Sequence, residues 1–341
     1  MAYTTINKST DYFNPVAYAG DGTSDRPVTS GFATDFVWIK NRNTTDDHVL
    51  FNKIRGGTKY IYTNNNQAES TYSSLDLTFE STGVDVGSYT TINNNGSNLI
   101  SYHWKANGAG VTNTAGSINS TVSANTTAGF SIVSYTGTGA NATVGHGLGS
   151  ACKFIMIKRL NSTNDWEIGS TALGWDKHLY FTVGSANSNS NRFQDTAPTN
   201  SLFYIGNGAG VNASSSPLIA YCFANVKGFS KIGNYTGNGN VDGTFVYTGF
   251  KPAFVMAKRT DDNGDWIMCD NGRNVSNVVN KKLFTNLAQA EDSYDSFDFV
   301  SNGFKIRSSG TGHNASGGNY IYIAFAEAPL VGTNGVTAKA R

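Results

Sequence analysis

Charged residues are scarce in this sequence. Asp, Glu, Lys and Arg make up 14% of the 341 residues, whereas average soluble proteins have about 25%. The 25 basic and 24 acidic residues nearly cancel, which gives a formal net charge of +1. Because no basic excess is present to neutralise a phosphate backbone, the composition disfavours nucleic-acid binding. Disorder is also disfavoured, since the chain has 20 Phe, 17 Tyr and 5 Trp residues and disordered chains are short of aromatics.

Cysteine and long apolar runs are nearly absent as well. The three cysteines, Cys152, Cys222 and Cys269, include no close-spaced pair, so neither a disulfide framework nor a zinc site is indicated and we expect buried strand residues. No segment approaches 18 consecutive apolar residues, and the first eight residues do not resemble a signal peptide. We therefore expect the protein to be made in a cytoplasm and not to insert into a membrane. We also expect it to have no metal or other cofactor.

The residues that replace the missing charge are Gly (38 in number), Asn, Ser and Thr. Gly and Asn favour tight turns, while Thr, Tyr, Phe, Val and Ile suit the pleated surface of a strand. The composition therefore predicts an all-β protein with many connections and little helix.

One pattern occurs three times along the chain and defines its organisation. A Tyr-x-Gly-x-Gly turn begins at Tyr18, Tyr135 and Tyr235. Each turn is followed by an apolar run that ends in basic residues, then by a segment that starts with Asp, and finally by a closing apolar run. These three segments occupy 36–40, 47–50 and 99–104 in copy one, 154–159, 165–168 and 218–223 in copy two, and 254–259, 265–268 and 320–325 in copy three.

Copies of roughly 100 residues are long enough to bury their own cores as β-sandwiches. We predict three tandem antiparallel β-sandwich repeats of jelly-roll or lectin-like type. The predicted organisation is an N-terminal arm at 1–12, repeats at 13–106, 129–225 and 228–327, a linker rich in Gly, Ser, Thr and Asn at 107–128, and a C-terminal tail at 328–341. Hairpins are predicted at 154–168, at the corresponding segment of copy three, and at 297–306, where Asn-Gly separates alternating apolar residues.

Several features suggest extensive packing between parts or copies of the chain. The run 154–157 is apolar on both faces of the pleat, so a long loop, a neighbouring domain or another subunit should cover its outer face. The short junction at 226–228 holds copies two and three together, whereas the long linker leaves copy one free to stand apart. Arms outside the repeats can add strands to an open sheet edge. We expect a homo-oligomer or lattice component, trimeric if it belongs to a fibre.

The sequence contains no catalytic constellation with adequate spacing, and we predict that the protein is not an enzyme. The segment 261–265 resembles the start of a calcium loop but lacks the Glu that completes an EF-hand.

Trp166 and Trp266 are equivalent and are expected in the core, whereas the unmatched Trp175 is a candidate for an exposed platform. Polar loops before each closing run can present hydrogen-bonding groups to glycans or proteins, a merely solvated loop being the alternative. With Trp175, the candidate receptor- or partner-binding residues are Asn94, Asn95, Asn212, His313 and Asn314.

The chain resembles a group of marine bacteriophage proteins, similar to those of cyanophages and pelagiphages, that are described as tail-fibre or virion structural proteins. The residues that carry the resemblance, which covers essentially the whole chain, are 1–13, 41–43, 102–108, 124–133 and 323–329. The group supplies no catalytic residue to transfer to this chain.

The resemblance implies a non-enzymatic structural protein of the virion. A tail fibre or similar appendage that contacts the host surface, including its glycans, is the first hypothesis, with other virion proteins as partners. The alternatives are a decoration protein on the phage head and a carbohydrate-binding lectin.

Overall fold

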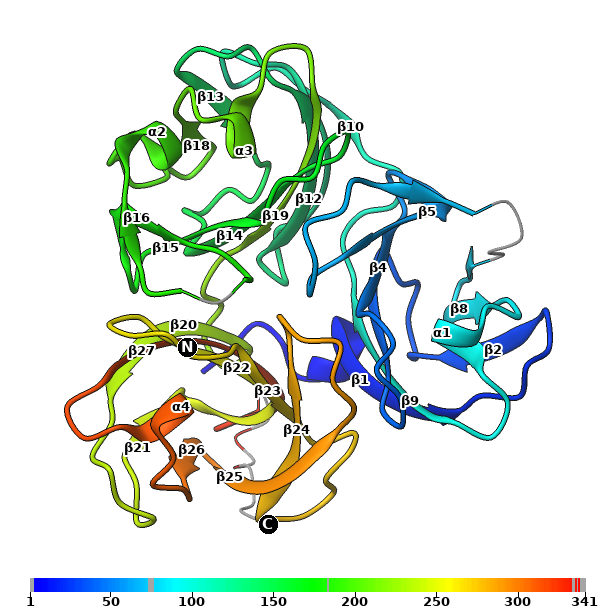
Figure 1. Cartoon of the computed structure of the whole chain (residues 1–341), viewed down its shortest axis with the longest axis vertical. Coiled ribbons are helices and arrows are strands. Elements are labelled where there is room, and N and C mark those ends of the chain that lie inside the picture. The colour runs from blue at the N-terminus through cyan, green and yellow to red at the C-terminus, as the bar shows by residue number, and fades with distance from the viewer. Residues whose placement is uncertain (1–2, 73–76, 183, 333–334, 336, 338–341) are drawn as a thin grey trace.

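The computed structural model describes residues 3–72, 77–182, 184–332, 335 and 337. The fold is nearly all β, as the composition predicts, with several antiparallel sheets and only single-turn helices. Figure 1 shows three lobes around a common centre. Lobe 1 contains β1 to β9, lobe 2 contains β10 to β19, and lobe 3 contains β20 to β27.

Lobe 1 follows a 3-10 turn, η1 (Ser9–Asp11). Its elements are β1 (Phe13–Ala19), β2 (Arg26–Thr29), β3 (Phe36–Asn41), β4 (Val49–Asn52), β5 (Gly56–Tyr62), β6 (Ser70–Thr71), β7 (Thr78–Phe79), β8 (Gly83–Val86), α1 (Thr90–Asn93) and β9 (Asn98–Trp104).

Lobe 2 has the largest number of elements in the chain. They are β10 (Val111–Asn113), β11 (Ser120–Asn125), β12 (Phe130–Thr136), β13 (Ala142–Gly145), β14 (Phe154–Arg159), β15 (Glu167–Ser170), β16 (Gly174–Leu179), β17 (Asn187–Ser188), α2 (Ser190–Phe193), β18 (Leu202–Ile205), α3 (Ala209–Asn212) and β19 (Pro217–Phe223).

Lobe 3 is the third lobe around the common centre, and the three lobes together form a ring (Figure 1). Its elements are β20 (Ser230–Thr236), β21 (Phe245–Tyr247), β22 (Phe250–Arg259), β23 (Ile267–Asp270), β24 (Val279–Phe284), β25 (Asp292–Val300), β26 (Gly303–Ile306), α4 (Thr311–Asn314) and β27 (Asn319–Pro329).

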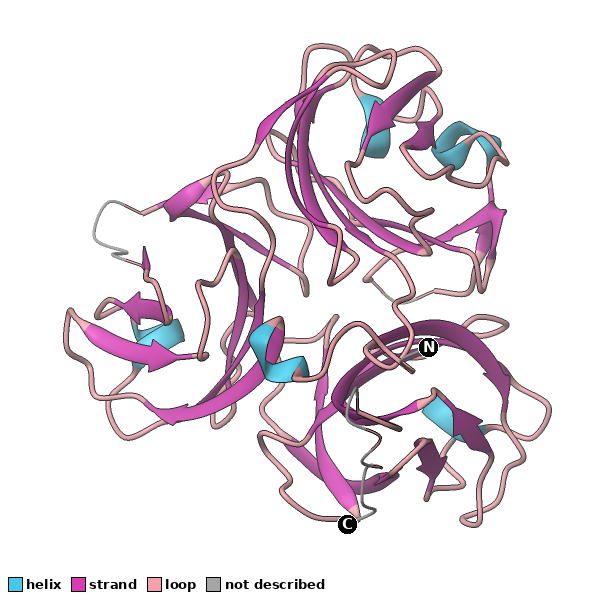
Figure 2. Ribbon diagram, turned by 180° about the vertical axis from the view of Figure 1, so that it is seen from behind, coloured by secondary structure: helices cyan, strands magenta, loops and turns pink. Residues whose placement is uncertain are grey.

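The three large sheets share one strand order. It runs β1-β9-β3-β4-β5 in lobe 1, β12-β19-β14-β15-β16 in lobe 2 and β20-β27-β22-β23-β24 in lobe 3. The predicted hairpins are confirmed as β14 with β15, β22 with β23, and β25 with β26, where Phe297 pairs with Ile306. Figure 2 shows a one-turn helix beside the curved main sheet of each lobe.

The repeated turn is fixed by the same hydrogen bonds in each lobe. The hydroxyls of Tyr18, Tyr135 and Tyr235 donate to the carbonyl oxygens of residues 92, 211 and 313 over 2.6, 2.7 and 2.9 Å. The second glycine of the motif has φ of +70°, +76° or +69°, a left-handed conformation that other residues rarely adopt. At the first glycine, a Cβ would come within 2.2–2.3 Å of a backbone oxygen. Both glycines are therefore required by the turn.

The main sheets bury both of their faces, which explains the doubly apolar runs. In β14, Phe154 and Met156 face the centre of the ring, while Ile155 and Ile157 face the interior of lobe 2. Aromatic rings from all three lobes meet at the centre: the centroids of Phe36 and Tyr221 are 4.4 Å apart, and Phe325 lies 4.7 Å from Phe13 and 5.7 Å from Phe223. The outer face of each sheet is thus covered by the other two lobes.

Matched backbone hydrogen bonds close the ring at three junctions. Residue 69 of lobe 1 donates to the Leu160 oxygen of lobe 2 over 2.7 Å, Ala186 of lobe 2 to the Thr260 oxygen of lobe 3 over 2.9 Å, and Glu291 of lobe 3 to the Arg42 oxygen of lobe 1 over 2.8 Å. We name these contacts junction 1–2, junction 2–3 and junction 3–1. The expectation that copy one is free to stand apart is wrong, because lobe 1 contacts both other lobes and contributes to the shared core.

The segments outside the repeats lie against the same chain. Within the N-terminal arm, Tyr3 and Thr4 donate through their hydroxyls to the carbonyl oxygens of Gly249 and Lys227, each over 2.7 Å, and Ile6 is buried. The linker at 107–128 contains β10 and β11, which form the edge of the lobe 2 sheet. β27 continues to Pro329, and most of the predicted tail beyond residue 332 lies outside the described residues.

Candidate functional site

A pocket of about 240 Å³ opens in lobe 3 beside the one-turn helix α4. It lies over β23 and β24, between the start of β25 and the loop that precedes β27. We call it the His313 pocket. Its lining residues are Asp265, Ile267, Lys282, Phe284, Tyr294, Gly310, Gly312 and His313.

His313 supplies an unused hydrogen-bonding group to this region. The residue is 3% exposed, its ring lies 5.7 Å from that of Phe297, and its Nε2 has no hydrogen-bond partner in the described part of the chain. Burial, together with the nearby charge of Lys282, lowers the pKa of His313 to about 4. The imidazole is therefore neutral at pH 7, and it can either donate or accept one further hydrogen bond.

The opposite wall of the pocket combines aromatic rings with a cation. Tyr294 is 48% exposed. The Lys282 ammonium lies 4.9 Å from the centroid of its ring and 5.2 Å from that of Phe284, and it forms an ion pair of 3.1 Å with Asp292. Cation–π contacts and the ion pair hold the lysine in place. The pocket thus offers a half-exposed aromatic face beside polar groups of both charges.

The same place is filled in the other two lobes. Strand register aligns Ile267 and Lys282 with Val49 and Tyr60 in lobe 1. The hydrogen bonds of the tyrosine turns align His313 with Ile92 of lobe 1. There, the rings of Tyr60, Tyr72 and Tyr89 pack together at centroid distances of 5.4–6.3 Å. The open pocket is therefore a feature in which lobe 3 differs from lobe 1.

In lobe 2 the corresponding space contains a buried polar cluster. Glu167 and His178 occupy the positions of Ile267 and Lys282, and Arg192 Nε of α2 forms an ion pair of 2.8 Å with Glu167 Oε1. Glu167 is 3% and His178 1% exposed. Burial raises the pKa of Glu167 to about 7 and lowers that of His178 to about 4. The two side chains lie 3.9 Å apart, but they are sealed from solvent, so the cluster is not accessible to a substrate.

Two of the predicted binding asparagines are structural. Asn212 and Asn314 are 0% exposed, and so is Asn93, their counterpart in lobe 1. Each accepts a hydrogen bond from the backbone of the Tyr-x-Gly-x-Gly turn, over 2.7, 2.9 and 3.0 Å respectively. Each also donates to carbonyl oxygens of that turn. The prediction that Asn212 and Asn314 bind a receptor or partner is therefore wrong, because their amides are fully used inside the fold.

The remaining candidates are dispersed. Trp175 is 7% exposed and packs edge-on against Phe193 at 5.5 Å, so the prediction of an exposed platform is wrong. Asn95 is exposed, and Asn94 is half-buried with its amide donating to Ser97 Oγ over 2.9 Å. Both lie on the loop after α1 in lobe 1. Of the six residues, only His313 lines the pocket.

Trp166, Trp266 and the three cysteines are all buried. Trp166 and Trp266 are each 1% exposed, which confirms their predicted place in the core. The three cysteines are free and buried, as predicted.

Sequence reasoning missed Lys282 and Tyr294. The signal was present in the alignment of the copies, because Lys282 stands where the others have Tyr60 and His178. The contrast between copies pointed to the pocket more directly than did the polar composition of the loops.

The fold and the pocket define an antiparallel, three-lobed β protein with a small surface pocket. Residues 8–329 match the model of a family described as a domain of unknown function, DUF7483, and the chain belongs to this family. No curated protein matches the sequence.

Among the residues that the structure describes, no helix is long and apolar enough to span a membrane. Within the same residues, no group of three or more His, Cys, Asp or Glu side chains is placed to hold a metal ion.

Proposed function

We propose that the protein is a non-enzymatic glycan-binding module that recognises a sugar ring in the His313 pocket. The half-exposed Tyr294 is the observation that carries the proposal, because an aromatic face beside polar and charged side chains suits the apolar face and hydroxyls of a sugar. Small-molecule pockets usually measure about 300–1,000 Å³. At about 240 Å³ the His313 pocket suits a single ring rather than a larger ligand.

We infer that the three lobes are tandem antiparallel sandwiches of jelly-roll or lectin-like type, with the repeats at 13–106, 129–225 and 228–327. The common strand order and the three equivalent tyrosine turns support this inference. A rigid scaffold of this kind presents loops at fixed positions, where binding sites commonly occur.

The biological setting follows from the sequence resemblance alone. We propose a virion component in a tail fibre or similar appendage, which would place the pocket against host surface glycans. A decoration protein of the phage head is the rival. Association of the purified protein with intact host cells would favour the fibre, whereas stoichiometric coverage of the head lattice would favour the rival.

The homo-oligomer stays a prediction. The doubly apolar strands are covered within the chain and the N-terminal arm packs on lobe 3, so neither feature requires a second copy of the chain. Sedimentation of the purified protein measures its oligomeric state directly.

An array of bacterial surface glycans tests the binding function. We expect Tyr294→Ala to weaken binding by about tenfold or more, since truncation of a central aromatic contact usually costs more than 1 kcal/mol. Tyr72→Ala is the matched control, because Tyr72 has the equivalent position in lobe 1 and is 44% exposed. Equal binding by Tyr294→Ala and wild type, or no binding to any glycan by the wild type, would contradict the proposal.

A further inference from the structure

A second and larger cavity, of about 400 Å³, lies at junction 2–3. Lobe 2 contributes Leu173, Lys177 and Ala186 to its lining, and lobe 3 contributes residues that include Asn234, Thr260 and Asn319. The origin of this cavity becomes clear when the three junctions are compared position by position.

Junction 1–2 is closed by a charged triad. Arg55 Nη1 lies 2.9 Å from Glu69 Oε2, and Lys59 Nζ lies 3.7 Å from Glu69 Oε1. The second amino group of Arg55 donates to the Leu50 carbonyl oxygen over 3.0 Å.

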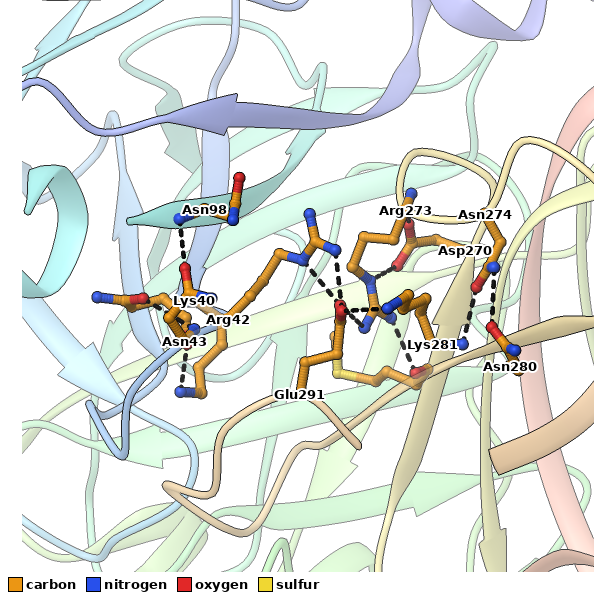
Figure 3. Close-up of polar contacts among 12 residues, drawn as sticks. Lys40, Arg42, Asn43, Asn98, Asp270, Arg273, Asn274, Asn280, Lys281 and Glu291 are labelled. Atoms are coloured by element: carbon orange, nitrogen blue, oxygen red, sulfur yellow. Dashed lines mark hydrogen bonds and ion pairs between the residues drawn. The ribbon is translucent and has the colours of Figure 1, made fainter. Parts of the chain in front are cut away.

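Junction 3–1 repeats this geometry. Arg273 Nη1 lies 3.2 Å from Glu291 Oε2, Lys281 Nζ lies 3.6 Å from Glu291 Oε1, and Arg273 donates to the Met268 oxygen over 3.0 Å. Figure 3 shows Arg273, Lys281 and Arg42 converging on the Glu291 carboxylate. Corresponding distances in the two triads agree within 0.3 Å, so the same side-chain arrangement is repeated at both junctions.

Junction 2–3 keeps the backbone contact but loses two members of the triad. Strand register places Leu173 at the arginine position and Ala186 at the glutamate position, while Lys177 retains the lysine position. The Tyr102 and Tyr221 side chains that reach across the other two junctions are also replaced here, by Ile323. The smaller Leu173 and Ala186 side chains line the cavity where arginine and glutamate stand at the other two junctions.

Lys177 is consequently a cation without the carboxylate that its two counterparts have. Among the described residues it has no ion pair. Asp261 also lines the cavity, but its carboxylate is paired with Arg259 over 2.8 Å. The side chains of Asn234, Thr260 and Asn319 add amide and hydroxyl groups to the lobe 3 wall.

We propose that this cavity binds a sugar acid, with the ligand's carboxylate beside Lys177 in the place that glutamate occupies at the other two junctions. A charge-assisted hydrogen bond from lysine to a carboxylate is among the stronger polar contacts. The amide and hydroxyl groups of the opposite wall suit the hydroxyls of the ligand. This site is distinct from the His313 pocket and does not depend on it.

Calorimetric titration with D-glucuronate and D-galacturonate, and with D-glucose as the uncharged control, tests the proposal. For wild type we expect at least one acid to bind with a Kd of about millimolar order, and glucose to bind about tenfold more weakly or worse. Lys177→Gln should weaken binding of that acid by about tenfold, whereas Lys59→Gln, the matched change at junction 1–2, should leave it unchanged.

Ala186→Glu is the decisive variant, because it supplies Lys177 with the carboxylate found at the other junctions and so should abolish binding of the acid while the protein stays folded. Unchanged binding by Ala186→Glu, or no saturable binding of either acid by wild type, would overturn the proposal. Loss of binding in Tyr294→Ala but not in Ala186→Glu would assign the acid to the His313 pocket instead, and would also overturn it. Failure of the glycan-array test leaves these outcomes unaffected, because Tyr294, the residue changed in that test, does not line the cavity at junction 2–3.

Discussion

Junction 3–1 and junction 2–3 have the same backbone contact but opposite chemistry. At junction 3–1, Arg273 is completely buried between Asp270 at 2.6 Å and Glu291 at 3.2 Å. At junction 2–3, the corresponding residues are Leu173, Ser170 and Ala186, and a cavity remains. The ring therefore closes without the charged network at one of its three junctions. The difference teaches that shared apolar packing and the backbone contacts occur at every junction, whereas the side chains at the junctions differ.

Breaking the charged junction should have the largest effect. Arg273→Ala leaves the buried Asp270 carboxylate without its cation and removes one of the three cations around Glu291, and removal of one partner from a buried ion pair costs about 3–5 kcal/mol. We expect the free energy of unfolding, measured in urea, to fall by that amount. Leu173→Ala at junction 2–3 is the matched change and should cost about 1–2 kcal/mol, because Leu173 is only partly buried. Equal losses at both junctions would show that the charged network contributes nothing special.

Acidification tests positions at which the lobes differ. His48, His103, His178 and His313 all stand where the other copies have other residues, and burial lowers the pKa of each, to about 3 for His103 and about 4 for His178 and His313. His146 is lowered as well. The unfolded chain therefore takes up protons that the folded chain does not, so stability is lost as the pH falls through 6.5.

The expected loss between pH 7 and pH 5.5 is about 1 kcal/mol for each of His103, His178 and His313. Glu167, whose raised pKa has the opposite sign, offsets part of it, which leaves a net loss of about 2 kcal/mol from these four groups. Urea unfolding at the two pH values measures this difference. His313→Val, which introduces the lobe 2 residue, should reduce the loss by about 1 kcal/mol; a loss as large as that of wild type would mean that His313 is not buried in its neutral form.

The buried asparagines test what the three lobes share. Asn212→Ala removes an acceptor from the Thr138 backbone and leaves donors and acceptors of the turn unpaired. An unsatisfied buried polar group costs about 1–3 kcal/mol, so we expect thermal unfolding to report a loss of about 2 kcal/mol. Asn95→Ala, on the exposed part of the equivalent loop in lobe 1, should change stability by less than about 0.5 kcal/mol. A neutral Asn212→Ala would contradict the structural role.

Converting one junction into another should have the smallest effect. The double change Leu173→Arg and Ala186→Glu rebuilds the triad at junction 2–3 beside Lys177. Partly exposed ion pairs contribute about 0–1 kcal/mol, so a gain of up to about 1 kcal/mol in urea unfolding is expected. A large destabilisation would show that junction 2–3 cannot accommodate the geometry of the other two.

Much of the fold could be predicted from the sequence, because its signals are local. The apolar runs, the Asn302-Gly303 hairpin and the Tyr-x-Gly-x-Gly turns depend on alternation and turn chemistry within a few residues. Closure of the lobes into a ring could not be predicted. It depends on which face of a doubly apolar strand meets which other strand, and the sequence of one strand does not contain that information.

The candidate site was predicted only in part for the same reason. A polar residue in a predicted loop gives the same sequence signal whether its side chain faces solvent or the interior of the fold. The sequence therefore does not distinguish His313 from Asn212 and Asn314, whose side chains serve the turn. The lack of a counterpart in the other copies suggests an exposed Trp175, yet the ring packs edge-on against Phe193 of α2. Comparison of equivalent positions in three dimensions separates these cases.

Comparison of the junctions predicts that a sugar acid binds at the one junction that departs from the other two. A crystal structure of the protein soaked in D-glucuronate tests it most directly. The expected result is a sugar acid at junction 2–3 with its carboxylate within about 3 Å of Lys177 Nζ, and no ligand beside Lys59 or Lys281, whose glutamate partners are already in place. An empty junction 2–3 at saturating ligand, or ligand bound equally at all three junctions, would contradict the claim.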